Sequence, residues 1–199
     1  PAHLDNIFSV LQMQTSHNFR YYIKNPIVHR IKRRMSLKQI EKMCDYTNFL
    51  RESPTETMEL FNDLLISVTS FFREPKSWDE LKKTVIKSLV EEKNPNESIR
   101  IWVPGCASGE EAYSIGILLL EELNKKNKKN DIRIFATDIN EKALEIARAG
   151  KYTTSEANSI TPQRRFKKFF KKTETDFSVS RALREGGFLF LGNSETIGQ

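Results

Sequence analysis

The sequence predicts an α/β protein in which a small all-helical domain precedes a domain built on a parallel sheet. Apolar residues recur at helical spacing through the first third of the chain. Two short strand-like stretches, Arg100–Val103 and Asp131–Thr137, then alternate with amphipathic helical stretches. Such alternation is typical of parallel sheets with crossover helices. A last apolar stretch, Gly187–Gly192, predicts one further strand.

The domain organisation follows from the same patterns. We expect a helical domain over residues 1–74, a linking helix and polar linker over residues 75–98, and the α/β domain over residues 99–199. Within the last, residues 151–184 place phenylalanines among lysines and arginines, a pattern that fits either short strands or one short helix and a hairpin.

Cap signals divide the helical stretches. Asn25-Pro26 predicts the cap and first residue of a second helix, because proline has no N–H to leave unpaired there. Ser36–Gln39 and Ser53–Glu56 have the form of capping boxes and predict the starts of a third and a fourth helix. Asn140 and Gly150 predict the two ends of the last helix in the α/β part.

The composition excludes several classes of protein. The 199 residues are 38% hydrophobic and 29% charged, which is ordinary for a globular protein. No apolar run approaches the ~20 residues of a membrane span, and no signal peptide is expected. Two cysteines make neither a disulfide framework nor a metal site, so we expect a cytoplasmic protein without a metal. The net charge of +6 fits an acidic partner or simple solubility.

The turn after the first strand is the strongest candidate for a binding site. Gly105 and Gly109 let the backbone approach a ligand closely. The turn lacks the glycine spacing of dinucleotide sites and the lysine of a P-loop. Glu110 and Glu111 would repel a pyrophosphate and suit a ligand with a sulfonium or an α-amino group. The alternative is that both carboxylates only complement the helix dipole.

Asp138 ends the second predicted strand and is the second candidate. A carboxylate at this place accepts hydrogen bonds from both hydroxyls of a ribose. The alternative is an aspartate at a helix N-terminus beside Asn140. Together with the glycine turn, Asp138 predicts a cofactor that contains a nucleoside.

Thr69 and Arg73 flank two phenylalanines in the connection before the linking helix. The planar fork of an arginine binds a carboxylate of a substrate or cofactor well. The alternative is a surface arginine that lies over Phe72.

Four motifs together resemble one known family; they are Val68–Pro75, Trp102–Ser114, Ala136–Asn140 and Gly186–Glu195. Over residues 4–198 the chain resembles the bacterial chemotaxis receptor methyltransferases of the CheR type. These are S-adenosylmethionine-dependent protein-glutamate O-methyltransferases, and the chain looks most similar to versions fused to a receptor methylesterase.

The resemblance implies a Rossmann-like methyltransferase domain that binds S-adenosyl-L-methionine and releases S-adenosyl-L-homocysteine. It implies that Arg73 is catalytic and that the cofactor is bound by Ser67, Thr69, Arg73, Gly105, Glu111 and Asp138. It also implies that Arg30, Arg33 and Arg34 dock on acidic cytoplasmic helices of chemoreceptors. Residues 151–184 would form a small β-subdomain, which some members of the family use to tether a receptor tail, and a fused or separate methylesterase is an implied partner. Neither nucleic acid binding nor membrane insertion is expected.

The chain departs from the family at one place. The family inserts a long segment, with two strands and residues of the methyl pocket, before the strand at Gly187. Here Leu183-Arg184 runs almost directly into that strand, so this central part of the catalytic domain is not among the 199 residues. Either residues are left out at this place, which we favour, or the chain is truncated. We therefore expect an incomplete sheet and, if the chain is continuous here, little or no methyl transfer. There are two competing hypotheses. One is a non-catalytic module that binds receptor or cofactor. The other, suggested by the charge, is a protein that binds or modifies nucleic acid.

Overall fold

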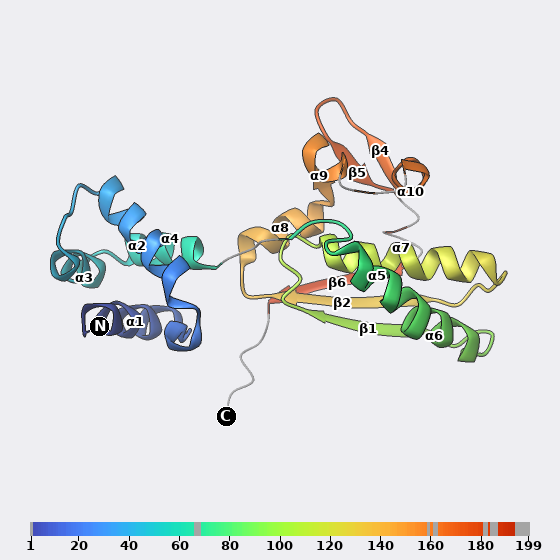
Figure 1. Cartoon of the computed structure of the whole chain (residues 1–199), viewed down its shortest axis with the longest axis horizontal. Helices are drawn as coiled ribbons and strands as arrows, with labels where there is room; N and C mark the ends of the chain where they lie inside the picture. Colours follow the sequence, from blue (N-terminus) through green and yellow to red (C-terminus); the bar gives the residue numbers. More distant parts are fainter. Residues whose placement is uncertain are drawn as a thin grey trace. The chain divides into compact units, whose positions relative to one another are not determined.

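The computed structural model describes residues 2–65, 69–158, 160, 163–180, 183 and 187–193. The chain forms two compact units, Pro1–Ile66 and Ser67–Gln199 (Figure 1). Across the described parts, no helix is both long and apolar enough to cross a membrane. The junction from Arg184 to Gly186, where the family inserts its extra segment, lies outside the described residues.

The first unit is entirely helical among its described residues. It consists of α1 (Ala2–Thr15), the short 3₁₀ turn η1 (Phe19–Tyr21), α2 (Lys24–Leu37), α3 (Met43–Glu52) and α4 (Pro54–Leu64). Its core is made of fully buried apolar side chains, among them Ile7, Leu11, Phe19, Ile27, Ile31, Leu50 and Leu60. The predicted cap of the fourth helix is confirmed, because the Ser53 hydroxyl accepts a hydrogen bond from the Glu56 amide at 3.3 Å.

Two other predicted caps are wrong. Ser36–Gln39 does not start a helix, since α2 continues into this stretch and α3 begins only beyond it. The Ser36 hydroxyl instead donates to the Lys32 carbonyl at 3.0 Å, which is the hydrogen bond of a serine inside a helix. Asn25 is not a cap either, because Ile23 holds that position. The buried stripe along α2 overrides these local signals.

The second unit alternates helices and strands as predicted. A linking helix comes first, made of α5 (Pro75–Leu81), the π-helical stretch η2 (Lys82–Ile86) and α6 (Lys87–Glu92). The α/β part follows with β1 (Ile99–Pro104), α7 (Glu110–Lys125), β2 (Ile132–Asp138) and α8 (Glu141–Ala149). The β-subdomain contains β3 (Lys151–Tyr152), α9 (Thr154–Asn158), α10 (Gln163–Phe169), β4 (Phe170–Lys172) and β5 (Phe177–Val179), and β6 (Gly187–Asn193) comes last.

Both predicted ends of α8 are confirmed. The Asn140 side chain accepts a hydrogen bond from the Ala143 amide at 3.2 Å. Gly150 follows the helix in the left-handed conformation, with φ of 57°, where glycine carries no steric penalty.

The unit contains two separate sheets. The main sheet has the order β1-β2-β6 and is parallel throughout, with Ile99 opposite Ile132 and Ile132 opposite Gly187. The small sheet has the order β3-β5-β4 and is antiparallel. Within the described residues β1 pairs with β2 alone, so the main sheet is incomplete and one edge of β1 is open.

The two faces of the main sheet differ. Ile99, Val103 and Ile134 alternate along β1 and β2 and are buried, and the Ile134 side chain lies beside Gly116 of α7. The intervening positions point to the other face, where Trp102 is 63% exposed and Phe135 is 40% exposed. The apolar core of this unit therefore lies between the sheet and α7.

The boundary between the two units lies before the predicted one. We expect the helical domain to reach residue 74, whereas the compact units divide after Ile66. The reason is that Phe71 and Phe72 are buried in the core of the second unit. The connection before α5 thus belongs to the α/β part.

Candidate cofactor-binding site

Asp138 ties together the loops that follow β1 and β2. Its Oδ2 accepts a hydrogen bond from the Ala107 amide at 2.7 Å, and its Oδ1 accepts one from the Asn140 amide at 2.7 Å. A carboxylate has about four acceptor positions, so both oxygens keep the capacity to accept from hydroxyl groups. Asp138 is only partly buried. The carboxylate is therefore oriented by the backbone and accessible to a ligand.

The two glycines of the turn differ in the space around them. Gly105 has φ of +69°, and a Cβ built on it would meet nothing within 4 Å. Gly109 has φ of +93°, and a Cβ there would lie 2.8 Å from the Cβ of Ala147 in α8. Gly109 thus permits the close approach of two helices, whereas Gly105 presents bare backbone to open space. This is the arrangement expected of a ligand-facing turn.

The two glutamates at the start of α7 point in different directions. Glu110 is 2% exposed, whereas Glu111 is exposed on the first turn. Burial raises the pKa of Glu110, and hydrogen bonds from the Ser108 and Thr69 hydroxyls only partly offset this. Glu110 is therefore an internal group that touches the predicted cofactor-contact residue Thr69. Glu111 keeps its carboxylate available to a ligand.

The segment Thr69–Glu74, which we call the contact loop, is fixed against α7 within the second unit. The Phe72 amide donates to the Ser114 hydroxyl of α7 at 3.2 Å. Phe72 and Glu74 both have left-handed backbones, with φ of 51° and 57°. Such conformations cost about 1–3 kcal/mol each and persist only where the surroundings enforce them. The loop is thus held in place by its packing.

The predicted site residues fall into three groups. Thr69, Gly105, Glu111 and Asp138 surround the turn after β1. Arg73 lies exposed on the contact loop, and its role stays a prediction. Ser67 lies outside the described residues.

Cys106 is a packing residue of the turn. Its side chain is 1% exposed. Burial, with a smaller contribution from the charge of Asp138, raises the pKa of the thiol to about 12. A nucleophilic cysteine needs a thiolate, so Cys106 is unsuited to that role. The described residues contain no group of three or more histidines, cysteines or acidic side chains placed to hold a metal.

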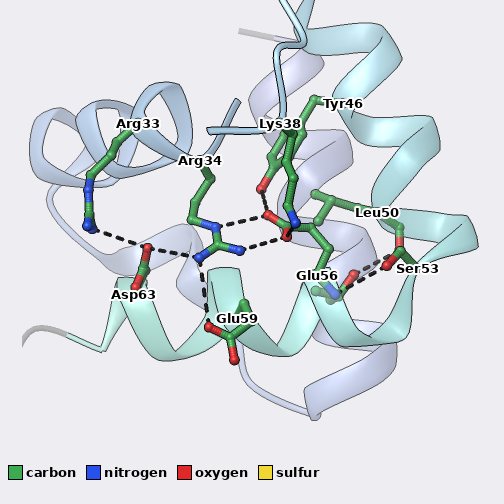
Figure 2. Close-up of polar contacts among 10 residues, drawn as sticks. Arg33, Arg34, Lys38, Tyr46, Leu50, Ser53, Glu56, Glu59 and Asp63 are labelled. Carbon is green, nitrogen blue, oxygen red and sulfur yellow. Dashed lines mark hydrogen bonds and ion pairs between the residues drawn. The ribbon is translucent and has the colours of Figure 1, made fainter. Parts of the chain in front are cut away.

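The arginines predicted to bind the receptor lie in the first unit. Of these, Arg34 forms ion pairs with several acidic side chains of α4. Figure 2 shows Arg34 reaching between Glu56, Glu59 and Asp63 of α4. Its Nε and Nη2 donate to the two oxygens of Glu56 at 2.9 and 2.6 Å. The Arg34 side chain is 11% exposed, whereas that of Arg33 is 69% exposed.

Sequence reasoning missed the centre of this network, Glu56. Its side chain is 2% exposed and also accepts hydrogen bonds from the Tyr46 hydroxyl at 2.9 Å and from Lys38 at 3.2 Å. Burial alone would raise the pKa of Glu56, but the bonds from Arg34, Tyr46 and Lys38 outweigh it and lower the pKa below its ordinary value. The capping box at Ser53 accounts for a glutamate at this position but gives no sign of its burial.

The comparisons with known proteins match both units. A family model described as the all-alpha domain of the CheR methyltransferases matches residues 2–65. A model described as the SAM binding domain of the same methyltransferases matches residues 67–185.

Individual relatives agree. A protein of Rhodobacter capsulatus described as an uncharacterized 104.1 kDa protein is 32% identical over 182 residues, which are 92% of this chain and 19% of that protein. The chemotaxis protein methyltransferase of Borreliella burgdorferi is 30% identical over 163 residues, 80% of this chain and 58% of that protein. The chemotaxis protein methyltransferase 2 of Vibrio cholerae is 33% identical over 153 residues, 76% of this chain and 51% of that protein.

The chain thus spans less than two thirds of the length of each of these relatives. The matched SAM binding domain contains the glycine turn, Asp138 and the contact loop, and this identifies S-adenosylmethionine as the cofactor of the second unit. The match covers more than half of the chain, and the all-alpha model covers most of the remainder, so the chain belongs to the CheR methyltransferase family.

Proposed function

We propose that the chain takes part in moving a methyl group from S-adenosylmethionine to glutamate side chains on the cytoplasmic helices of chemoreceptors. The reaction would serve chemotaxis adaptation in the cytoplasm. The observation that carries this proposal is the Asp138 carboxylate, oriented by two backbone amides at 2.7 Å beside a glycine turn. The names of the relatives from Borreliella burgdorferi and Vibrio cholerae support the methyltransferase reaction and its connection to chemotaxis.

The residues of the site fit this cofactor. Asp138 would accept the two ribose hydroxyls, and the exposed carboxylate of Glu111 would pair with the amino group of the methionine part. Gly105 offers open space next to its backbone. Thr69 would contact the cofactor from the contact loop, and Ser67 is assigned the same role from the family resemblance alone.

Methyl transfer to a carboxylate requires little proton transfer by the protein. When bound, the cofactor supplies a methyl group activated by its sulfonium. A glutamate carboxylate is already ionised at neutral pH, since its ordinary pKa is about 4.3, and it needs no general base. The chain would exclude water and align the carboxylate, an effect that supplies much of the rate in such reactions. Arg73 would orient the carboxylate with its planar fork.

Receptor recognition is assigned to the basic surface of α2. Lys24, Lys32 and Arg33 are exposed on this helix and would face acidic receptor helices. Arg30 is half-buried and donates a hydrogen bond to the Asp63 carbonyl. Arg34 would act mainly from within, because its guanidinium already binds Glu56 and so holds α2 against α4.

A second candidate is a module that binds the cofactor without transferring the methyl group. The observation in its favour is the main sheet, which has three strands in the described part of the chain and an open edge at β1. The residues of the methyl pocket that the family resemblance implies would then be missing while the ribose contact remains.

Cofactor binding and methyl transfer are tested separately. We expect isothermal titration to show S-adenosylmethionine binding, and Asp138→Asn to weaken it by about tenfold or more, as for a lost hydrogen bond to a charged group. Asp131→Asn is the matched control, because this exposed aspartate precedes the other end of β2. Circular dichroism would confirm that both variants are folded.

Transfer is then measured with labelled S-adenosylmethionine and receptor cytoplasmic fragments. We expect base-labile label on glutamate, and Arg73→Ala should abolish the label while cofactor binding persists. Binding without any transfer by the unmodified chain would favour the second candidate. Absence of cofactor binding would overturn both.

A further inference from the structure

We propose that Arg165, on α10 of the β-subdomain, is a positioning residue that holds the contact loop in its ligand-binding conformation. The inference rests on the proposed function for the role of this loop. Arg165 is not among the residues that the sequence predicts for the site. Its place in the structure connects three segments that are far apart in the chain.

The guanidinium group of Arg165 contacts two elements. Its N–H groups bind α7, and its flat face lies on the contact loop. Its Nε and Nη2 donate to the two carboxylate oxygens of Glu121, both at 2.8 Å. Its guanidinium carbon lies 4.3 Å from the centre of the Phe72 ring. The side chain is 13% exposed. A planar cation is suited to satisfying a carboxylate and stacking on an aromatic ring at the same time.

The partners of Arg165 keep the fork in place. Lys82 also lies 3.4 Å from a Glu121 oxygen. Burial alone would raise the pKa of Glu121, but the hydrogen bonds and positive charges of Arg165 and Lys82 together outweigh it, so the pKa lies below its ordinary value and the carboxylate is charged at neutral pH. Arg165 is thus fixed to α7 by a pair of charged hydrogen bonds.

Both phenylalanines of the contact loop are packed in place, Phe72 beside Arg165 and Phe71 against other residues of the β-subdomain. Phe72 is held from other sides by Trp78, at 5.4 Å between ring centres, and by the bond of its amide to Ser114. Phe71 packs edge-on against Tyr152 at 4.8 Å and Phe170 at 5.2 Å, which are both residues of the β-subdomain.

Thr69 and Arg73 stand on either side of these two rings in the chain. Their positions are therefore set by the subdomain, and Arg165 supplies the polar connection. The Phe72 backbone is left-handed. Loss of the Arg165 contacts should therefore let the contact loop relax toward an ordinary backbone conformation.

The test is Arg165→Gln in the full chain, with Lys168→Gln as the matched control. Lys168 is a cation on the same helix. It shares with Arg165, Glu121 and Lys82 the lining of a cavity of about 330 Å³, but its ammonium lies over Phe169, 5.2 Å from the centre of that ring. Two measurements are made on each protein: hydrogen exchange of the amides of residues 69–74, and the affinity for S-adenosylhomocysteine by titration.

We expect Arg165→Gln to speed exchange in the contact loop and to weaken binding by about tenfold, as for a lost stacked cation and its fork. Lys168→Gln should change neither. Arg165→Lys restores the charge but not the planar fork, and should recover only part of the protection. Glu121→Gln, which removes the other half of the fork, should speed exchange in the same loop.

Unchanged exchange in the contact loop of Arg165→Gln would overturn the inference, as would an equal effect of Lys168→Gln. A variant that loses protection in β1 and β2 as well would indicate general unfolding and would count against a positioning role. If the unmodified chain binds no cofactor, the proposed function fails, and the exchange measurement alone decides whether Arg165 holds the loop.

Discussion

Each unit of the molecule contains a bidentate arginine–glutamate ion pair with a lysine beside the carboxylate. The two ion pairs differ in how far they are exposed to solvent. In the first unit Arg34 binds Glu56, whose side chain is 2% exposed. In the second unit Arg165 binds Glu121, whose side chain is 24% exposed. The first carboxylate is enclosed, and the second is partly hydrated.

This difference separates stability from positioning. A carboxylate enclosed like Glu56 is costly when it loses its partner, because water cannot replace the lost bonds. A carboxylate like Glu121 is partly compensated by water and by Lys82. The Arg34 pair therefore contributes to the stability of the helices, whereas the Arg165 pair mainly determines where the contact loop lies.

The largest expected effect is that of Arg34→Ala. It leaves Glu56 buried without its main partner, which costs about 3–5 kcal/mol in such cases. Urea unfolding followed by far-UV circular dichroism should show this loss in the first unit. Both tryptophans, Trp78 and Trp102, belong to the second unit, so tryptophan fluorescence should report an unchanged transition.

The control for this prediction is Arg33→Ala. Arg33 lies on the same helix, 3.5 Å from Asp63, and its side chain is 69% exposed. An exposed pair of this kind contributes about 0–1 kcal/mol. Equal losses from Arg33→Ala and Arg34→Ala would show that enclosure of the pair is not what matters.

Acid should weaken the first unit through Glu56. The pKa of Glu56 is lowered in the folded state, so its contribution is complete above the ordinary glutamate pKa of about 4.3. The contribution is lost as the pH falls below that value and through the lower folded pKa. We expect the stability difference between the unmodified chain and Glu56→Gln to shrink over this range, measured by urea unfolding at several pH values. A constant difference would show that Glu56 does not titrate in this way.

The contribution of Arg165 to the stability of the second unit is expected to be smaller. Arg165→Gln should lower the free energy of unfolding by about 1–2 kcal/mol, as for hydrogen bonds to a charged group that is partly hydrated. Tryptophan fluorescence during urea unfolding measures this change. A loss as large as that of Arg34→Ala would remove the distinction between the two pairs.

The sequence predicts those parts of the site that depend on local order. The glycine turn and Asp138 come directly after their strands, so the parallel sheet brings them together as expected. The Ser53 cap is likewise local, because the serine and the amide it accepts from are three residues apart. Ser36 shows the limit, since a serine hydroxyl caps one helix or bonds within another according to the burial of its neighbours.

The parts that could not be predicted depend on long-range packing. Glu110 points inward and Glu111 points outward. The orientation of α7 about its own axis, as it packs on the sheet, decides between them, and two adjacent glutamates in the sequence do not specify that orientation. The contact loop belongs to the second unit because Phe71 packs against Tyr152 and Phe170, which are remote in sequence. No local pattern connects such distant positions.

The smallest expected effect comes from the lysine beside the second pair. Lys82 is 37% exposed and lies 3.4 Å from Glu121, which Arg165 already binds with two hydrogen bonds. Lys82→Gln should therefore change the free energy of unfolding by no more than about 0.5 kcal/mol and leave exchange in the contact loop unaltered. Urea unfolding and hydrogen exchange measure the two quantities. If Lys82→Gln released the loop as Arg165→Gln should, positive charge near Glu121 would suffice, and the planar fork stacked on Phe72 would not be the feature that holds the loop.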